Sequence, residues 1–327
     1  MRGSSAVRQG GFRESAGELS DEKILITGPA GRIGIGLARY LAEDNEVWGI
    51  ARFGDSVSRS RVEQLGLTTQ VVDLASGRLD DVPADFTYVI HLAADFSAND
   101  YDQALRVNAE ATGFLLEHCR RAKAALVMST VSTYKPHPDP WHRFTETDPL
   151  GDAMAPPSAP YSVSKIAQEA VARYCARSFD LPVTIARMGA AYGDQGGLPV
   201  FHLDAVAEGR PVSTRWEPMP YSPIHDTDIC GQIAALLDAA SVPATTVNWC
   251  GDEAVSVQEW TQFFGELLGV EATVEVEPIP GASIGSVGDP TRRTAITGPC
   301  TVPWRDGFRA VVTQRHPDLV RTGSAED

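Results

Sequence analysis

Short apolar runs alternate with amphipathic stretches along most of the chain, and turn-forming residues bound each run. Runs of this length predict buried β-strands at residues 23–27, 46–51, 69–72, 88–92, 125–128, 182–186 and 245–249. Apolar positions at helical spacing predict helices that begin near Arg32 and cover residues 101–122, 161–179 and 229–237. Strands alternating with helices favour an α/β fold with a doubly wound parallel sheet, whose ligands lie at the carboxyl ends of the strands.

The pattern changes after residue 188. Segments 189–221 and 251–327 contain many Pro and Gly residues and shorter apolar runs, so we expect a smaller, discontinuous lobe there. Residues 21–188 with 222–250 then form the sheet domain. Residues 1–20 are rich in Gly, Ser and Arg, lack the apolar core of a signal peptide and are predicted to be a disordered tail.

The amino-acid composition limits the kinds of partner that the protein is expected to bind. The net charge of −15 argues against binding to nucleic acid or to acidic membranes, and no apolar run is long enough to span a bilayer. Five cysteines without a C-x-x-C pair indicate a reducing compartment, so we expect a cytoplasmic protein. The seven histidines show no metal-ligand spacing, so no metal site is predicted.

A glycine-rich turn, G-x-x-G-x-x-G, lies between the first strand and the first helix. Gly28 permits the tight turn, Gly31 allows close approach of a pyrophosphate, and Gly34 allows the helix to pack against the strand. The phosphates would face the helix N-terminus. We therefore expect a Rossmann-type, dinucleotide-binding sheet domain and a substrate-binding lobe. The turn supplies these predicted cofactor contacts: Gly28, Ala30, Gly31, Arg32, Ile33 and Gly34.

The tip of the second strand selects between the two nicotinamide cofactors. An acidic residue there binds the ribose 2′-hydroxyl, whereas a basic residue accommodates a 2′-phosphate. Arg52 stands at this tip and Asp55 comes later, so NADP is favoured over NAD. Ends of the next two strands add further predicted cofactor contacts: Asp73 and Leu74 near the adenine, and Leu92, Ala93 and Ala94 where the backbone approaches the dinucleotide.

Tyr161 and Lys165 lie four residues apart on a predicted helix and therefore share one face. A phenol is a poor base at neutral pH, but a nearby ammonium stabilises the phenolate and favours proton transfer. Lys165 can also hold the hydroxyls of the nicotinamide ribose. Thr130 follows the fifth strand and is the predicted orienting hydroxyl, with Ser132 as the alternative. The predicted substrate contacts are Phe96, Val131, Ser132 and Ala190.

From about residue 23 to 309 the chain resembles the extended short-chain dehydrogenases/reductases, which include NAD-dependent epimerases and dehydratases. The resemblance is carried by the glycine turn, Asp73-Leu74, His91 to Ala94, Val107-Asn108, Ser129-Thr130, Tyr161-x-x-x-Lys165, Arg187, Tyr192-Gly193 and His225-x-x-Asp228. It implies that Thr130, Tyr161 and Lys165 are catalytic and that Asn108 steadies the fourth strand. It also implies that Met188 and Gly189 lie beside the nicotinamide. Homodimers of the family commonly form through the helices at 101–122 and 161–179.

Departures from the family pattern narrow the function. Val131-Ser132 stand where dehydratases carry Asp-Glu. Ala190 replaces the Asn of nucleotide-sugar enzymes, and Tyr221-Ser222-Pro223 replaces an Arg-Asp-Tyr segment. These losses argue against a nucleotide-diphosphate-sugar substrate, although Arg215, Arg292 and Arg293 remain as candidate anion ligands.

Three functions remain for a protein that acts on a small-molecule substrate. The sequence favours an NAD(P)-dependent oxidoreductase, an alcohol dehydrogenase or ketone reductase with Tyr161 as general acid/base. The alternative is a sugar epimerase or isomerase that keeps its cofactor bound. A dinucleotide-sensing regulator is disfavoured because regulators of this fold commonly lack the Tyr/Lys pair, which this chain retains.

Overall fold

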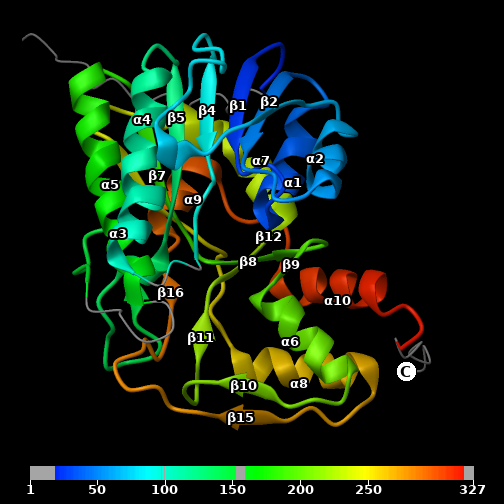
Figure 1. The fold of residues 1–327 in the computed structure, drawn as a ribbon. Coiled ribbons are helices and arrows are strands. Elements are labelled where there is room, and N and C mark those ends of the chain that lie inside the picture. The colour runs from blue at the N-terminus through cyan, green and yellow to red at the C-terminus, as the bar shows by residue number, and fades with distance from the viewer. Residues whose placement is uncertain (1–18, 97, 99, 152–158, 320–327) are drawn as a thin grey trace, which may run out of the picture.

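The computed structural model describes residues 19–96, 98, 100–151 and 159–319. Its upper half is one parallel sheet, which confirms the predicted fold class (Figure 1). From one edge to the other, the strands are β13 (Thr245–Trp249), β7 (Val183–Met188), β5 (Ala124–Thr130), β4 (Tyr88–His91), β1 (Lys23–Thr27), β2 (Glu46–Ala51) and β3 (Thr68–Val71). The order reverses between β1 and β4, and ligands of such sheets bind at that point.

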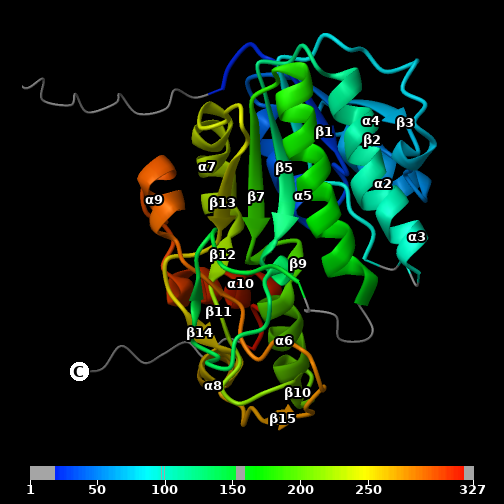
Figure 2. The same cartoon turned by 90° about the vertical axis from the view of Figure 1, so that its left-hand side faces the viewer.

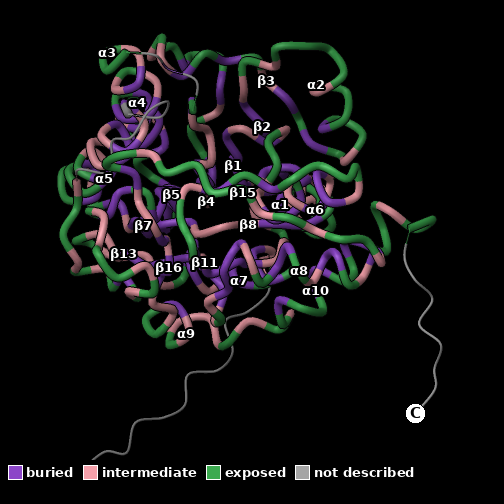
Figure 3. The backbone as a smooth tube through the Cα atoms, turned by 90° about the horizontal axis from the view of Figure 1, so that it is seen from below, coloured by how far each residue is buried: buried purple, intermediate pink, exposed green. Residues whose placement is uncertain are grey.

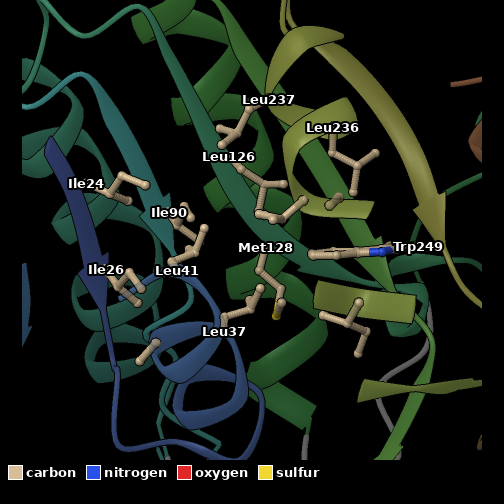
Figure 4. Close-up of a cluster of buried hydrophobic side chains, with 14 of the residues drawn as sticks. Ile24, Ile26, Leu37, Leu41, Ile90, Leu126, Met128, Leu236, Leu237 and Trp249 are labelled. Atoms are coloured by element: carbon tan, nitrogen blue, oxygen red, sulfur yellow. The ribbon is translucent and has the colours of Figure 1, made fainter. Parts of the chain in front are cut away.

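Helices cover both faces of the sheet because its strands are apolar on both sides. One face packs against α1 (Arg32–Leu41), α7 (Asp226–Asp238) and part of α2 (Ser56–Glu63). Figure 4 shows this core, in which Leu37 and Leu41 of α1 and Leu236 and Leu237 of α7 pack on the same face of the sheet. The opposite face packs against α4 (Ala111–His118) and α5 (Ala159–Phe179). Figure 3 shows buried segments in the interior and exposed ones along the rim.

The helix predicted over residues 101–122 is shorter and less regular than expected. It consists of α3 (Tyr101–Ala104), a π-helical segment η2 (Leu105–Glu110) and α4, which ends at His118. Asn108 lies within the π segment. Its side chain accepts a hydrogen bond from the Asp95 backbone N–H (2.8 Å) and donates to Ser164 Oγ (2.9 Å). The widened turn therefore coincides with the residue that ties the loop after β4 to α5.

Residues after 189 build a separate hydrophobic cluster below the sheet (Figures 1 and 2). Its main helices are α6 (Leu198–Ala207), α8 (Val257–Leu268) and α10 (Trp304–Arg315). Short strands connect them: β8 (Ala190–Gly193), β9 (Gly196–Gly197), β10 (Val212–Thr214), β11 (Pro220–Tyr221), β12 (Pro223–His225), β14 (Val255–Ser256) and β15 (Val274–Val276). The remaining elements are β6 (Arg143–Phe144), β16 (Val287–Gly288), α9 (Thr291–Thr297) and the 3₁₀ turns η1 (Leu74–Ser76) and η3 (Val131–Thr133).

The lower cluster is joined to the sheet by β8 and β12, which pair in parallel directly beyond the end of β7. Asp228 of α7 reinforces the junction, since its carboxylate accepts hydrogen bonds from the Thr301 backbone N–H (2.6 Å) and hydroxyl (2.8 Å). Among the described residues, no helix combines the length and apolar character needed to cross a membrane. The domain boundaries at 188, 222 and 250 stay a prediction.

Candidate active site and cofactor cavity

A cavity of about 660 Å³ opens at the carboxyl edge of the sheet, at the reversal between β1 and β4. Residues from the ends of β1, β2, β4, β5 and β7 line one side of it, and residues from β8, β9, α6 and α7 line the other. It contains these predicted cofactor contacts: Gly28, Ala30, Gly31, Arg32, Ile33, Gly34, Arg52, Asp73, Leu74, Leu92, Ala93, Ala94, Lys165, Met188 and Gly189. The fold thus brings together residues that lie far apart in the sequence.

The glycine turn fits the pyrophosphate of a dinucleotide. Gly28 has φ = +68°, a conformation that side chains disfavour, and a Cβ there would meet the Ala93 backbone at 3.2 Å. A Cβ at Gly34 would clash with the carbonyl oxygen of Gly28. Gly31 precedes α1 and has no side-chain cap, so the first N–H groups of the helix face the cavity. These features leave a cradle that a pyrophosphate can enter.

A buried chain of hydrogen bonds holds this cradle against α4. The Thr27 hydroxyl accepts from the N–H groups of Leu92 (3.1 Å) and Ala93 (3.0 Å), so its own proton goes to His91 Nδ1 (2.8 Å). His91 Nε2 then donates to the Thr112 hydroxyl (2.8 Å). Burial lowers the pKa of His91 to about 3, which agrees with a neutral ring. The Ala93 backbone beside Gly28 is thereby fixed.

At the adenosine end, β2 leads into Arg52, Phe53 and Gly54, all of which line the cavity. Phe53 has φ = +43°, an uncommon conformation for an aromatic residue, and it turns the chain sharply. The Asp55 carboxylate accepts a hydrogen bond from the Ser58 N–H (2.6 Å) and caps α2. Asp55 is therefore engaged in the helix cap and does not line the cavity, whereas Arg52 does.

Thr130, Tyr161 and Lys165 line the cavity where β5 ends and α5 begins. A side-chain hydrogen bond joins Thr130 to Tyr161; burial raises the pKa of the phenol, and this bond lowers it. The Lys165 Nζ donates to the carbonyl oxygen of Met128 (2.7 Å). Burial lowers the pKa of Lys165 to about 7, and the negative charge of Glu169 acts in the opposite direction. A phenol, an ammonium and a hydroxyl thus share one buried site.

The structure separates Thr130 from the neighbouring hydroxyls. Ser129 also lines the cavity, but its Oγ donates to Glu169 (2.7 Å). The Ser132 backbone N–H donates to Thr130 Oγ1 (3.1 Å), but neither Ser132 nor Val131 lines the cavity. Their contact with substrate stays a prediction. Thr130 is the hydroxyl that reaches Tyr161.

The other predicted substrate contacts, Phe96 and Ala190, do line the cavity. The Phe96 ring lies 4.7 Å from that of Tyr161 between centroids, and its side chain is 64% exposed. Asn108 does not line the cavity and contacts the loop after β4 through Asp95. These contacts hold the loop after β4, where the resemblance places Asn108 in steadying the fourth strand. The sequence also suggests Asn108 as a cofactor contact, and that contact stays a prediction.

The candidate anion ligands of the lobe lie elsewhere. Arg293 is fully buried and forms an ion pair with Asp252, while its Nη1 donates to the Gly298 carbonyl (2.8 Å). Arg215 Nη2 donates to the Tyr221 hydroxyl (3.4 Å). Neither residue, nor Arg292, lines the cavity.

Sequence reasoning missed several residues of the cavity wall. They come mainly from the segments after β8 and from the start of α7: Phe53, Ser58, Gly196, Gly197, Leu198, Phe201 and Asp226. Gly196 and Gly197 have φ of +102° and +129°, and their pairing with β8 brings this segment over Arg32. The adjacent glycines were a detectable signal, whereas nothing local in the sequence marked Asp226.

Asp226 places a carboxyl group in the wall, beside Gly193, where its side chain leaves no room for a Cβ. Burial, together with the negative charge of Asp194, raises the pKa of Asp226 to about 7, although Arg32 opposes the shift. Arg32 begins α1 and stacks its guanidinium over the Phe201 ring (5.3 Å to the centroid). A titrating carboxyl group thus lies near the cation of the pyrophosphate cradle.

The fold and the cavity are those of a Rossmann-type protein, in which a dinucleotide-sized cavity lies at the carboxyl ends of the strands. Residues 24–203 match the NAD dependent epimerase/dehydratase family, and the chain belongs to that family. The predicted resemblance to the extended short-chain dehydrogenases/reductases is thereby confirmed.

The curated relatives that the chain matches are named as enzymes of nucleotide-sugar metabolism. A "Probable dTDP-glucose 4,6-dehydratase" of Sinorhizobium fredii is 33% identical over 195 residues, which are 52% of this chain and 54% of that protein. The chain spans about half the length of the curated relatives it matches.

Solved structures of similar fold include a Thermus thermophilus UDP-glucose 4-epimerase complexed with NAD. It is 25% identical with a TM-score of 0.76, over 89% of this chain and 97% of that one. A Bacillus cereus UDP-glucuronic acid 4-epimerase has a TM-score of 0.77 at 22% identity, over 90% and 100% of the two chains.

Asp226→Asn should weaken the pH dependence of dinucleotide affinity. Asp226 is neutral below its pKa of about 7 and anionic above it, so it repels the bound phosphates as the pH rises. We expect wild-type affinity to fall about fivefold more than that of the variant between about pH 6 and about pH 8, as ~1 kcal/mol of repulsion implies. Isothermal titration calorimetry measures this, with Asp238→Asn at the far end of α7 as the control. Parallel profiles for wild type and Asp226→Asn would exclude the effect.

Proposed function

We propose that the protein is an NAD(P)-dependent sugar epimerase, which oxidises a secondary alcohol and then reduces the resulting ketone from the opposite face. The observation that carries this proposal is the buried group of Thr130, Tyr161 and Lys165 at one end of a dinucleotide cavity. A bound nicotinamide dinucleotide would supply the hydride acceptor and donor for both halves of the reaction.

Tyr161 and its neighbours account for the proton transfers. Tyr161 takes the proton of the substrate hydroxyl and later returns it. Thr130 orients the reacting oxygen through its own hydroxyl. The Lys165 ammonium stabilises the phenolate that forms at Tyr161. The Phe96 ring packs against the ring of Tyr161, with 4.7 Å between the centroids.

The carboxylates that line the cavity are not placed for the elimination of water from the substrate. Its acidic lining residues, among those described, are Asp73 near the adenosine end and Asp226 near Arg32. Neither stands next to Thr130, where the following residues are Val131 and Ser132. A dehydratase reaction requires an acid/base pair at the carbon next to the ketone, and Thr130 has no such neighbour.

The named relatives change the preference that the sequence alone suggested. That preference was an alcohol dehydrogenase or ketone reductase, with a sugar epimerase as the alternative. The names of the relatives specify sugars linked to dTDP or UDP. Both of the solved structures described above are 4-epimerases. They support the epimerase, and they make UDP- and dTDP-sugars the first substrates to test despite the departures at Ala190 and residues 221–223.

Tyr161→Phe should abolish epimerisation and leave dinucleotide affinity within about twofold, because only the proton-transferring hydroxyl is lost. Product is followed by NMR on UDP- and dTDP-hexoses and on the corresponding free sugars, with Tyr174→Phe as the control. Wild type should invert one stereocentre without net change in the absorbance of reduced nicotinamide. Steady net reduction of added cofactor would instead indicate the dehydrogenase, and full activity of Tyr161→Phe would rule out the mechanism.

For the cofactor, we propose a preference for NADP over NAD. Arg52 lines the cavity at the end of β2, is exposed, and forms no ion pair with another residue in the described part of the chain. Arg59 is paired with Glu63 (2.8 Å), and Asp55 caps α2. Arg52 therefore remains as the cation for a 2′-phosphate. The named epimerases were solved with NAD, so this choice would distinguish the protein from them.

Arg52→Ala should weaken NADP by about 10- to 100-fold and NAD by less than about twofold, because a hydrogen bond between charged groups contributes about 1.5–3 kcal/mol. Binding of the reduced cofactors is measured by their fluorescence, and Arg120→Ala serves as an exposed control. Equal losses for the two cofactors would remove the case for a phosphate site at Arg52.

We also propose a homodimer formed through α4 and α5, in the cytoplasm. The two helices pack closely, since a Cβ at Gly113 would meet Val171 at 3.2 Å. Their outer faces expose Phe114 (39%) and Tyr174 (66%). All five cysteines are free thiols, which suits a reducing compartment.

Tyr174→Glu should shift the protein to monomers, because it buries a charge in the proposed apolar contact. Sedimentation velocity measures the mass, and Val57→Glu on α2 is the matched control on another face. A monomeric wild type, or a variant that sediments like wild type, would contradict the proposed interface.

A further inference from the structure

A buried ion pair lies directly beneath the catalytic group. Arg187 of β7 donates to Glu169 of α5 through Nε (2.8 Å) and Nη2 (2.7 Å). Both side chains are at most 3% exposed. Ser129 Oγ, on β5, donates a third hydrogen bond to the same carboxylate (2.7 Å). Glu169 therefore connects the helix that carries Tyr161 and Lys165 with the strand that carries Thr130.

Stability alone explains this arrangement poorly. Two buried charges lose their hydration, and apolar replacements for such pairs are often equally stable. Further hydrogen bonds continue from the ion pair. Arg187 Nη1 donates to the Tyr134 hydroxyl (2.9 Å), and this hydroxyl donates to Asn248 Oδ1 (2.7 Å). Arg187, Ser129 and Glu169 belong to β7, β5 and α5, and each of these elements carries residues that line the cavity. The arrangement thus matches a need for position and charge at the site.

The negative charge of Glu169 acts on the buried side chain of Lys165. Glu169 follows it by one helical turn, and Lys165 itself is 1% exposed. The other ionisable groups around Lys165 are Tyr161 on its own helix, His91 of β4 and Arg187 of β7. His91 is neutral, Tyr161 is a phenol, and the Arg187 cation opposes a second positive charge. Glu169 is therefore the group around Lys165 that favours its ammonium form.

We propose that Glu169 is a positioning residue for proton transfer, holding Lys165 as an ammonium and fixing Ser129 so that the adjacent Thr130 faces Tyr161. The kinetic part rests on the proposed epimerase function. The electrostatic part does not, because the charge of Lys165 can be measured without substrate.

The test compares Glu169→Gln with wild type by NMR titration of lysine ¹³Cε and ¹⁵Nζ signals, with the Lys165 signal identified from a Lys165→Arg sample. Removing the carboxylate should lower the Lys165 midpoint by about one unit or more, the usual effect of an adjacent opposite charge. Glu110→Gln, an exposed carboxylate on η2, should leave it unchanged. A Lys165 midpoint that is the same in wild type and Glu169→Gln overturns the proposal.

A second variant keeps the test valid if Glu169→Gln does not fold with Arg187 left unpaired. Glu169→Gln/Arg187→Gln leaves no buried charge alone. Its Lys165 midpoint should still fall, but by less than in Glu169→Gln, because the repulsion by the Arg187 guanidinium is removed together with the attraction by Glu169. An unchanged midpoint in the double variant also overturns the proposal.

The pH dependence of kcat tests the role of Glu169 independently of the NMR titration. Since Lys165 acts as a cation, the high-pH limb of kcat should move to lower pH in Glu169→Gln by the same amount as the midpoint. Ser129→Ala should lower kcat about tenfold with KM unchanged, because it releases Thr130 without altering charge. If no sugar is epimerised, the proposed function fails while the NMR result still decides the role of Glu169. If epimerisation occurs but the limb does not move, the role of Glu169 fails alone.

Discussion

Seven strands run in the same direction, so all their carboxyl ends meet at one edge of the sheet. The side chains and backbone that follow β1, β2, β4, β5 and β7 consequently share one cavity. The Thr27 hydroxyl holds two of these ends together by accepting hydrogen bonds from Leu92 and Ala93. The cradle, the adenosine end and the proton-transfer group all depend on this constraint.

The sequence predicted the parts of the site that follow strands. Gly28 to Gly34, Arg52, Thr130 and the Tyr161/Lys165 pair were found because each has a local signal: a strand end, a glycine spacing or a helical repeat. Parallel pairing then brings them together without further information.

Residues that enter the site through long-range contacts escaped prediction. Asp226 lines the cavity only because β12 pairs with β8 and turns α7 toward Arg32. Val131 and Ser132, expected at the substrate, lie in the 3₁₀ turn η3 and are not among the residues that line the cavity. Asn108 was placed correctly near β4, but its contact with Asp95 depends on a π-helical turn that helical periodicity does not reveal.

The charged groups of the site follow from the same geometry. A low-polarity interior disfavours an isolated ammonium, yet Lys165 lies within it beside the carbonyl of Met128. Glu169 balances that cost, and Arg187 balances Glu169 in turn. Proton transfer at Tyr161 and the internal packing of α5 are thus linked through one set of buried charges.

The central claim is that hydride leaves and returns within a single active site. The direct measurement uses a sugar nucleotide deuterated at the carbon that is inverted, with product analysed by mass spectrometry and NMR. Deuterium should stay on that carbon in the epimer, because the hydride does not exchange with water. Loss of deuterium to solvent, or its release on free reduced cofactor, would contradict it.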